Sequence, residues 1–133
     1  MNKKEAKQNY KLNLRPAGVF QVRNMREEKV FVGSSLNLDG IFNRHEFQLK
    51  LNGHPNKRLQ ADWNELGKDC FAFEILEQIE SRENLDYKTE LEFLEDLWLE
   101  KLQPYGTRGY NEPKKTREER LQMIAENRLR KNY

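Results

Sequence analysis

The stretch VFVGSSLNLDGIFNRH, residues 30–45, joins the end of a β-rich run to the start of a helix. A second β-rich run, residues 19–23, precedes it, and the polar loop NMREE separates the two runs. This pattern predicts a β-hairpin over residues 19–32. Asn37 is a residue type that caps helix N-termini, and apolar residues recur at helical spacing after it, so we expect a helix over about residues 38–50.

The rest of the chain continues with helical and strand patterns. We expect a second helix over residues 57–66, a third strand over 70–76, a long helix over 85–102 and a last helix after Thr116. The apolar residues of the long helix are Leu91, Leu94, Leu97, Trp98 and Leu102. The order predicts an α+β fold, with a small three-stranded sheet, mixed or antiparallel, flanked by helices.

Charge divides the chain into three parts, although the net charge is only +2. Residues 1–16 carry five Lys and Arg against one Glu, and residues 112–133 carry seven against four. Residues 17–111 carry twelve basic against seventeen acidic side chains. We therefore expect a basic N-terminal arm (1–16), a central domain (17–111) and a C-terminal amphipathic helix (112–133). The basic ends could contact an anionic polymer such as DNA, whereas the central body would not attract one on average.

The cysteine content and the hydropathy indicate in which cellular compartment the protein resides. Cys70 is the only cysteine, so an internal disulfide cannot form. The N-terminus lacks the apolar region of a secretory signal, and no apolar run approaches the roughly 18 residues of a membrane span. We expect a cytoplasmic protein without a membrane partner, and the sequence gives no indication of its oligomeric state.

Short motifs in a fixed order carry a family resemblance. GVF at residues 18–20 and FVG at 31–33 place Phe20 and Phe31 eleven residues apart. After them come NGH at 52–54, the pattern N..LQ..WN..G...F.F.ILE, a glutamate three residues before a tryptophan, and GYN at 109–111. Over about residues 17–111 the chain resembles the GIY-YIG endonuclease superfamily, with the motif spacing that is common in its phage homing members.

The resemblance implies phosphodiester hydrolysis with one divalent metal ion. It implies that Glu95 is the metal ligand, for Mg²⁺ or Mn²⁺, and it places Phe20 and Phe31 where the family has two tyrosines that help to activate water. It places Ile41 where the family has an arginine that holds the scissile phosphate, with an assisting histidine, His45, one turn later. The residues that match others often carried by family members are Arg44, His45, His54 and Asn111.

The replaced residues lack the chemistry that hydrolysis needs. Phenylalanine can neither accept a proton nor orient a water molecule, and general-base help is worth about 10²–10⁴ in rate. Isoleucine cannot neutralise phosphoryl charge, and one well-placed electrostatic stabiliser is worth about 10²–10³. We therefore expect a degenerate catalytic site in a regulatory protein that binds nucleic acid or a partner without cleavage. One alternative is an active metal-dependent DNA endonuclease that uses Glu95 with Arg44, His45 and His54, and another is an interaction protein that never contacts DNA.

Each candidate residue also has a structural interpretation. Phe20, Phe31 and Ile41 would be core residues, Arg44 a solvated helix charge, and His45 a hydrogen-bonded structural histidine. Glu95 would hold a metal ion or form a salt bridge. Asn111 would line a site or pair with the backbone. We expect the last helix to pack on the domain, with an apolar stripe at Leu121, Ile124, Ala125 and Leu129, and a role as a nucleic-acid arm is the second interpretation.

Overall fold

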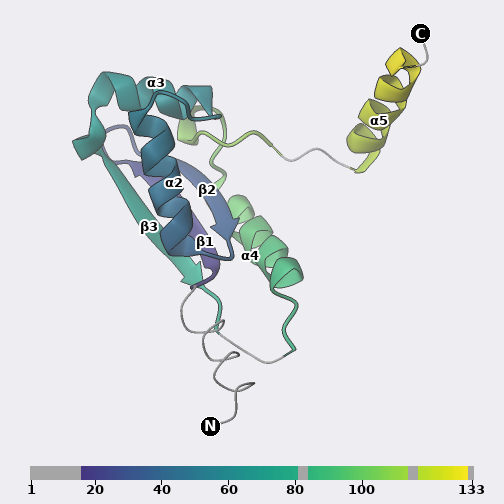
Figure 1. Ribbon diagram of the computed structural model, residues 1–133, viewed down its shortest axis with the longest axis horizontal. Helices are drawn as coiled ribbons and strands as arrows, with labels where there is room; N and C mark the ends of the chain where they lie inside the picture. Colours follow the sequence, from purple (N-terminus) through teal and green to yellow (C-terminus); the bar gives the residue numbers. More distant parts are fainter. Residues whose placement is uncertain (1–15, 81–83, 114–116, 132–133) are drawn as a thin grey trace.

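The computed structural model (Figure 1) describes residues 16–80, 84–113 and 117–131. Its elements are β1 (Gly18–Asn24), β2 (Lys29–Ser35), α2 (Leu38–Lys50), α3 (Lys57–Leu66), β3 (Phe71–Gln78), α4 (Tyr87–Leu102) and α5 (Arg117–Lys131). Two short 3₁₀ turns are η1 (Lys68–Cys70) and η2 (Gly106–Arg108). The expected order of strands and helices is confirmed, and α2 and α3 have the bounds that the sequence predicts.

The three strands form one antiparallel sheet in the order β2-β1-β3. The central strand β1 contributes side chains to both faces, because successive residues of a strand point to opposite sides. Phe20 and Val22 lie on one face and Val19 lies on the other, and all three are buried. The predicted α+β fold is therefore confirmed, and the sheet is antiparallel rather than mixed.

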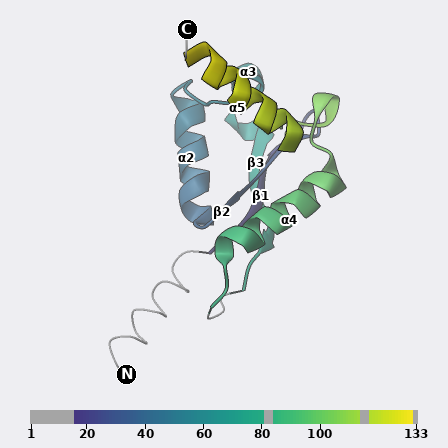
Figure 2. The same ribbon diagram turned by 90° about the vertical axis from the view of Figure 1, so that its right-hand side faces the viewer.

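Helices cover both faces of this sheet, as the two orthogonal ribbon views show (Figures 1 and 2). Side chains of α2 and α3 pack on the face of Phe20, in a buried cluster made of Phe20, Val22, Leu38, Leu49, Leu59, Trp63, Phe71 and Tyr110. Side chains of α4 pack on the opposite face, in a second cluster made of Val19, Val32, Ile79, Leu91, Leu94 and Leu99. The sheet therefore separates α2 from α4.

Side-chain caps explain where the helices begin. The Asn37 side chain accepts a hydrogen bond from the Gly40 amide at 3.1 Å, and the Asn56 side chain accepts one from the Leu59 amide at 3.0 Å. Helix α4 begins at Tyr87, later than predicted, because Asp86 caps it. Leu97 is 46% exposed, since the side of α4 that carries Leu91, Leu94 and Trp98 is the one that meets the sheet.

The outer edge of β2 is closed by a distant part of the chain. The Asn111 side chain accepts a hydrogen bond from the Val32 amide and donates one to the Val32 carbonyl, both at 2.8 Å. The Tyr110 amide donates to the Val30 carbonyl at 3.0 Å, and Gly109 forms a parallel bridge with Val30. Residues 109–111 thus cover the outer edge of β2 through one isolated parallel bridge and the Asn111 side chain, which satisfies backbone groups that would otherwise be open.

Helix α5 does not pack on the domain, so that prediction is wrong. Every described side chain from Arg117 to Leu129 is exposed, and Figure 1 shows α5 standing apart from the sheet. The reason is that α2, α3 and α4 already cover both faces of the sheet. Thr116 and the basic residues 1–15 lie outside the described residues, so the division into arm, domain and C-terminal helix stays a prediction. Among the described residues, no helix is both long and apolar enough to cross a bilayer.

We expect the Asn111→Ala variant to lower the free energy of unfolding by about 1–3 kcal/mol, because the buried Val32 backbone loses two partners. Urea denaturation measures this as a lower midpoint with an unchanged slope. Asn127→Ala, at an exposed position of α5, is the matched control and should leave the midpoint unchanged. Equal midpoints for the two variants would contradict the edge-pairing role of Asn111.

Candidate functional site

Five aromatic side chains from two strands, a helix and a loop form one cluster, which we call the aromatic cluster: Phe20, Phe31, Phe42, His45 and His54. The centroid of the Phe20 ring lies 6.5 Å from that of Phe31, 5.7 Å from that of Phe42 and 5.4 Å from that of His45. Phe31 also contacts His45 and His54, with ring centroids 5.6 and 6.1 Å apart. The residue at the family's second tyrosine position therefore contacts both histidines, and the residue at the first contacts His45.

The ring of Phe20 lies directly over Gly33 on the neighbouring strand β2. The two residues are register partners, and a Cβ atom at position 33 would lie 2.8 Å from the Phe20 Cζ atom. Any side chain at position 33 would therefore displace the ring. Phe20 is only 1% exposed, so its para position is enclosed by the core rather than open to water.

The two histidines form a direct hydrogen bond, with His45 Nδ1 and His54 Nε2 2.7 Å apart and the rings stacked. The Asn56 amide donates to His54 Nδ1 at 3.0 Å, so that nitrogen carries no proton in the neutral ring. His54 Nε2 then carries the proton and donates it to His45 Nδ1. Each ring therefore uses its unprotonated nitrogen as an acceptor within the protein.

Burial sets the protonation state of this pair. It lowers the pKa of His45 to about 4, and the positive charges of His54 and Arg44 add to the effect. Burial also lowers the pKa of His54. Since a single proton fits between the facing nitrogens, the pair is neutral near pH 7 and gains a charge only at acidic pH.

Gln60 on α3 holds the loop that carries His54. Its Oε1 atom accepts from the His54 amide, and its Nε2 atom donates to the Leu49 carbonyl at the end of α2, both at 3.0 Å. Gln60 is 5% exposed. The sequence analysis did not single out Gln60, and the signal that could have found it is its place on the apolar side of a capped helix, beside Leu59.

Tyr110 is a second residue whose role the sequence analysis missed. Its hydroxyl donates to Asp62 Oδ2 at 2.7 Å and accepts from Asn24 Nδ2 at 3.0 Å, and its carbonyl accepts from Asn56 Nδ2 at 2.7 Å. Burial raises the pKa of Tyr110, and the neighbouring Asp62 carboxylate adds to this. The phenol thus stays protonated and links the end of β1, α3 and the α3 cap.

The other predicted site residues lie in different surroundings. Ile41 is half-buried and packs against the same core as the aromatic cluster, whereas Arg44 is exposed on α2. Glu95 is half-buried on α4, the helix that packs on the opposite face of the sheet. Asn111 is bound to the backbone of β2. The structure therefore brings Phe20, Phe31, Ile41 and the histidines to one face, and it places Glu95 on a helix of the other face.

The donor set for a metal ion is incomplete in the part of the chain that the structure describes. No three His, Cys, Asp or Glu side chains come together there as a possible metal site. Mg²⁺ takes six oxygen ligands in octahedral geometry, and Glu95 alone would supply only one or two of these. Both facing nitrogens of the histidine pair are occupied by their mutual hydrogen bond. The described residues therefore form no metal site from protein ligands alone, and an ion held by Glu95 would take its remaining ligands from water and phosphate.

Comparison with known proteins identifies the family. The GIY-YIG catalytic domain matches residues 16–111. The chain belongs to the GIY-YIG family. Intron-associated endonuclease 1 of Enterobacteria phage T4 is 30% identical over 95 residues, which make up 71% of this chain and 36% of that protein. The chain therefore matches only about a third of the length of this curated relative. The likeness concerns the GIY-YIG catalytic domain.

Solved structures extend the likeness to the fold. Two structures of the catalytic domain of intron endonuclease I-TevI, one of them a mutant, each have a TM-score of 0.62 and 28% identity to this chain. The alignments cover 76% and 74% of this chain, and 97% and 99% of the respective catalytic domains. The GIY-YIG fold that the sequence predicts is thus confirmed across the whole catalytic domain of these relatives.

Acid should destabilise this GIY-YIG domain through the histidine pair. The unfolded chain protonates His45 as the pH falls through about 6.5, whereas the folded chain does so only near 4, so stability is lost on acidification between these values. We expect a loss of about 2 kcal/mol between about pH 7.5 and about pH 5, measured by urea denaturation. His45→Gln should flatten this dependence.

Nuclear magnetic resonance titration tests the same assignment without unfolding the protein. The chain has only two histidines, so their imidazole signals are easily resolved. A His45 signal that titrates near its unperturbed pKa of about 6.5 in the folded protein would contradict the buried, neutral pair.

Proposed function

We propose that this chain keeps the GIY-YIG nuclease scaffold with a disabled catalytic centre and binds DNA without cutting it, in a regulatory role. The observation that carries the proposal is the contact between Phe20 and Phe31 inside the aromatic cluster, with Ile41 packed against the same core. These three positions hold hydrocarbon where the family's mechanism uses two phenols and a guanidinium. A protein partner, in place of DNA, is the alternative ligand of this scaffold.

The proton-transfer part of the mechanism has no acceptor among these side chains. A phenyl ring has no group that binds or orients water. The two nearby histidines do not replace it, because His45 Nδ1 accepts from His54 and His54 Nδ1 accepts from Asn56. A proton could enter the pair only after a buried hydrogen bond is broken, and burial opposes the resulting charge.

The phosphate-binding part of the mechanism lacks its cation at the family's position. Ile41 packs into the core from α2, and Arg44 lies three residues further along the same helix, which rotates it about 60° away. Arg44 is exposed, so its guanidinium can contact DNA from the surface. An exposed arginine contributes to binding, but it is not preorganised toward a scissile phosphate.

The second candidate function is an endonuclease rebuilt around Glu95, Arg44 and the two histidines. The retained glutamate and the identity of the relatives, which are named as endonucleases, favour it. In such an enzyme a divalent ion, Mg²⁺ or Mn²⁺, would supply charge stabilisation and an activated water. Glu95 would be its one ligand from the predicted site.

Plasmid nicking separates these two functions. We expect no nicking of supercoiled DNA by the natural chain with Mg²⁺ or Mn²⁺, because the proton acceptors and the phosphate cation are replaced. The triple variant Phe20→Tyr, Phe31→Tyr and Ile41→Arg should raise nicking by at least about 10²-fold, and adding Glu95→Ala should abolish the gain. The matched control is Phe47→Tyr, which adds a phenol at an exposed position of α2. Nicking by the natural chain that Glu95→Ala abolishes would sink the proposal.

Salt dependence tests the binding itself. We expect retardation of duplex DNA that weakens as salt rises, because the basic ends would release counterions from phosphates. Changing Lys3, Lys4, Lys7 and Lys11 to Gln should reduce the slope of log K against log salt by about 0.9 for each phosphate that the arm no longer neutralises. The control variant changes Lys50 and Lys68 to Gln, since both lysines are paired with Glu46, at 3.1 and 3.3 Å. Equal slopes for the two variants would contradict binding through the N-terminal arm.

A further inference from the structure

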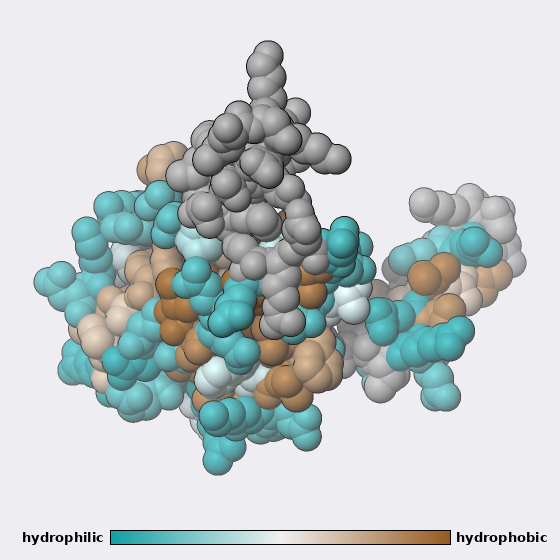
Figure 3. Space-filling view, turned by 90° about the horizontal axis from the view of Figure 1, so that it is seen from below, coloured by the Kyte–Doolittle hydropathy of each residue, from teal (hydrophilic) through white to brown (hydrophobic). Residues whose placement is uncertain are grey.

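Helix α5 carries an apolar stripe that the rest of the described chain leaves open to solvent. Leu121, Ile124 and Leu129 are 54%, 52% and 60% exposed. Figure 3 shows hydrophobic residues at the surface of the lobe on the right, which is α5. Arginines bracket this stripe at helical spacing, since Arg117 lies four residues before Leu121 and Arg128 lies four after Ile124.

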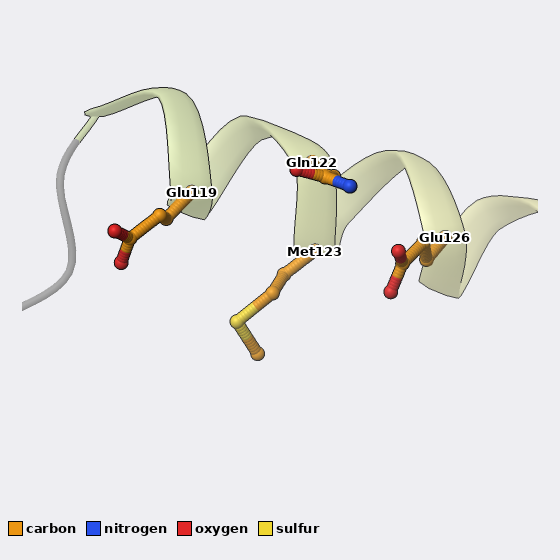
Figure 4. Close-up of a pocket in the computed structure, with 4 residues that line it drawn as sticks. All are labelled: Glu119, Gln122, Met123 and Glu126. Carbon is orange, nitrogen blue, oxygen red and sulfur yellow. The ribbon is translucent and has the colours of Figure 1, made fainter.

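The opposite face of α5 is more polar and carries acidic side chains. Figure 4 shows Glu119, Gln122, Met123 and Glu126 lining a hollow on that side. All four come from one helix, and on a helical projection they lie about 100° or more from Leu121. This face carries Glu119 and Glu126, whereas the stripe side carries Arg117, Arg120 and Arg128 against Glu118, so charge favours the stripe side for contact with an acidic surface.

Helix α4 offers a surface with the complementary pattern. Phe93 and Leu97, one turn apart, are 58% and 46% exposed on the side that faces away from the sheet. Glu90 lies three residues before Phe93, and Glu100 lies three residues after Leu97, so a carboxylate stands at each end of the apolar pair. Helix α4 as a whole carries five acidic against two basic side chains, and α5 carries five basic against three acidic ones.

We propose that α5 docks on Phe93 and Leu97 of a second copy of this chain, so that two chains exchange their α5 helices in a symmetric dimer. The stripe of Leu121 and Ile124 would cover the apolar pair, and Arg117 and Arg128, eleven residues apart, would approach the carboxylates of Glu90 and Glu100, ten residues apart. Such a pairing is self-complementary, since each chain gives one α5 and receives one, and it closes after two chains. In a reciprocal exchange the contact between α4 and α5 forms twice, once for each chain, so the dimer buries twice the apolar area of a single contact.

The arrangement within one chain favours a second copy over the chain's own α4. Figure 1 shows α5 apart from the α4 of its own chain, and both apolar surfaces stay exposed there. Asn111 is fixed to the edge of β2, and α5 starts six residues later. A tether of this length spans at most about 20 Å, which lets α5 project from the domain toward a neighbour.

Sedimentation velocity of the full chain measures the dimer. At low salt we expect a species of about twice the 16.0 kDa of one chain, and it should dissociate as salt screens the charges. The α4 variant, Glu90→Lys with Glu100→Lys, and the α5 variant, Arg117→Glu with Arg128→Glu, should each weaken dimerisation at least about tenfold. A natural chain that stays monomeric at low salt would overturn the proposal.

Mixing the two variants distinguishes exchange between chains from folding back within one chain. In the mixture, each reversed α5 meets a reversed α4 and each natural α5 meets a natural α4, so both interfaces regain opposite charges and a heterodimer should form. The control variant Glu65→Lys with Asp69→Lys reverses two exposed charges elsewhere and should dimerise like the natural chain. Circular dichroism confirms that each variant is folded. A mixture of folded variants that stays monomeric would overturn the exchange.

Discussion

The packing of the Phe20 ring over Gly33 is the constraint from which the rest of the site follows. The ring occupies the place of a side chain on β2, and it touches Phe31, Phe42 and His45 from the centre of the sheet. A phenol in that enclosed position would need a hydrogen-bond partner, whereas a phenyl ring needs none. The apolar residues at positions 31 and 41 fit this environment, because neither side chain has a polar group that needs a hydrogen-bond partner. Phe20, Phe31 and Ile41 therefore pack into one apolar core, and none of the three leaves a polar group there without a partner.

The histidine pair gives this apolar cluster its polar component. Two neutral imidazoles share one proton between facing nitrogens, and the chain of donors from Asn56 through His54 to His45 satisfies them inside the protein. Gln60 extends the network to the end of α2, so the loop between α2 and α3 is held at both of its ends. In the family's mechanism a histidine assists a reaction. In this arrangement the same residue type positions a loop and makes the domain sensitive to acid.

Local signals in the sequence were sufficient for the helices and strands, and distant pairings were not visible in it. Asn37 and Asn56 cap their helices through contacts within three residues, so the bounds of α2 and α3 could be predicted. Asn111 binds Val32, which is 79 residues away, so the sequence left open whether it would line a site or pair with the backbone. Helical spacing groups the apolar residues of α4 but does not determine which side of the helix meets the sheet, and Leu97 is exposed. For α5, the amphipathic pattern predicted packing on the domain, and it could not show that α2, α3 and α4 already cover both faces of the sheet.

The hydrogen bonds that join distant elements, and the positions where the family resemblance implies two tyrosines and an arginine, are separate sets of residues. Side chains that join distant elements are Asn24, Asn56, Gln60, Tyr110 and Asn111, and none of them is at a replaced position. Phe20, Phe31 and Ile41 contribute hydrocarbon contacts to one core, which phenyl and alkyl groups supply as well as larger polar side chains would. These long-range hydrogen bonds therefore do not depend on which side chains stand at the three positions. A surface function, such as binding a polyanion through the basic ends, does not require polar side chains at positions 20, 31 and 41.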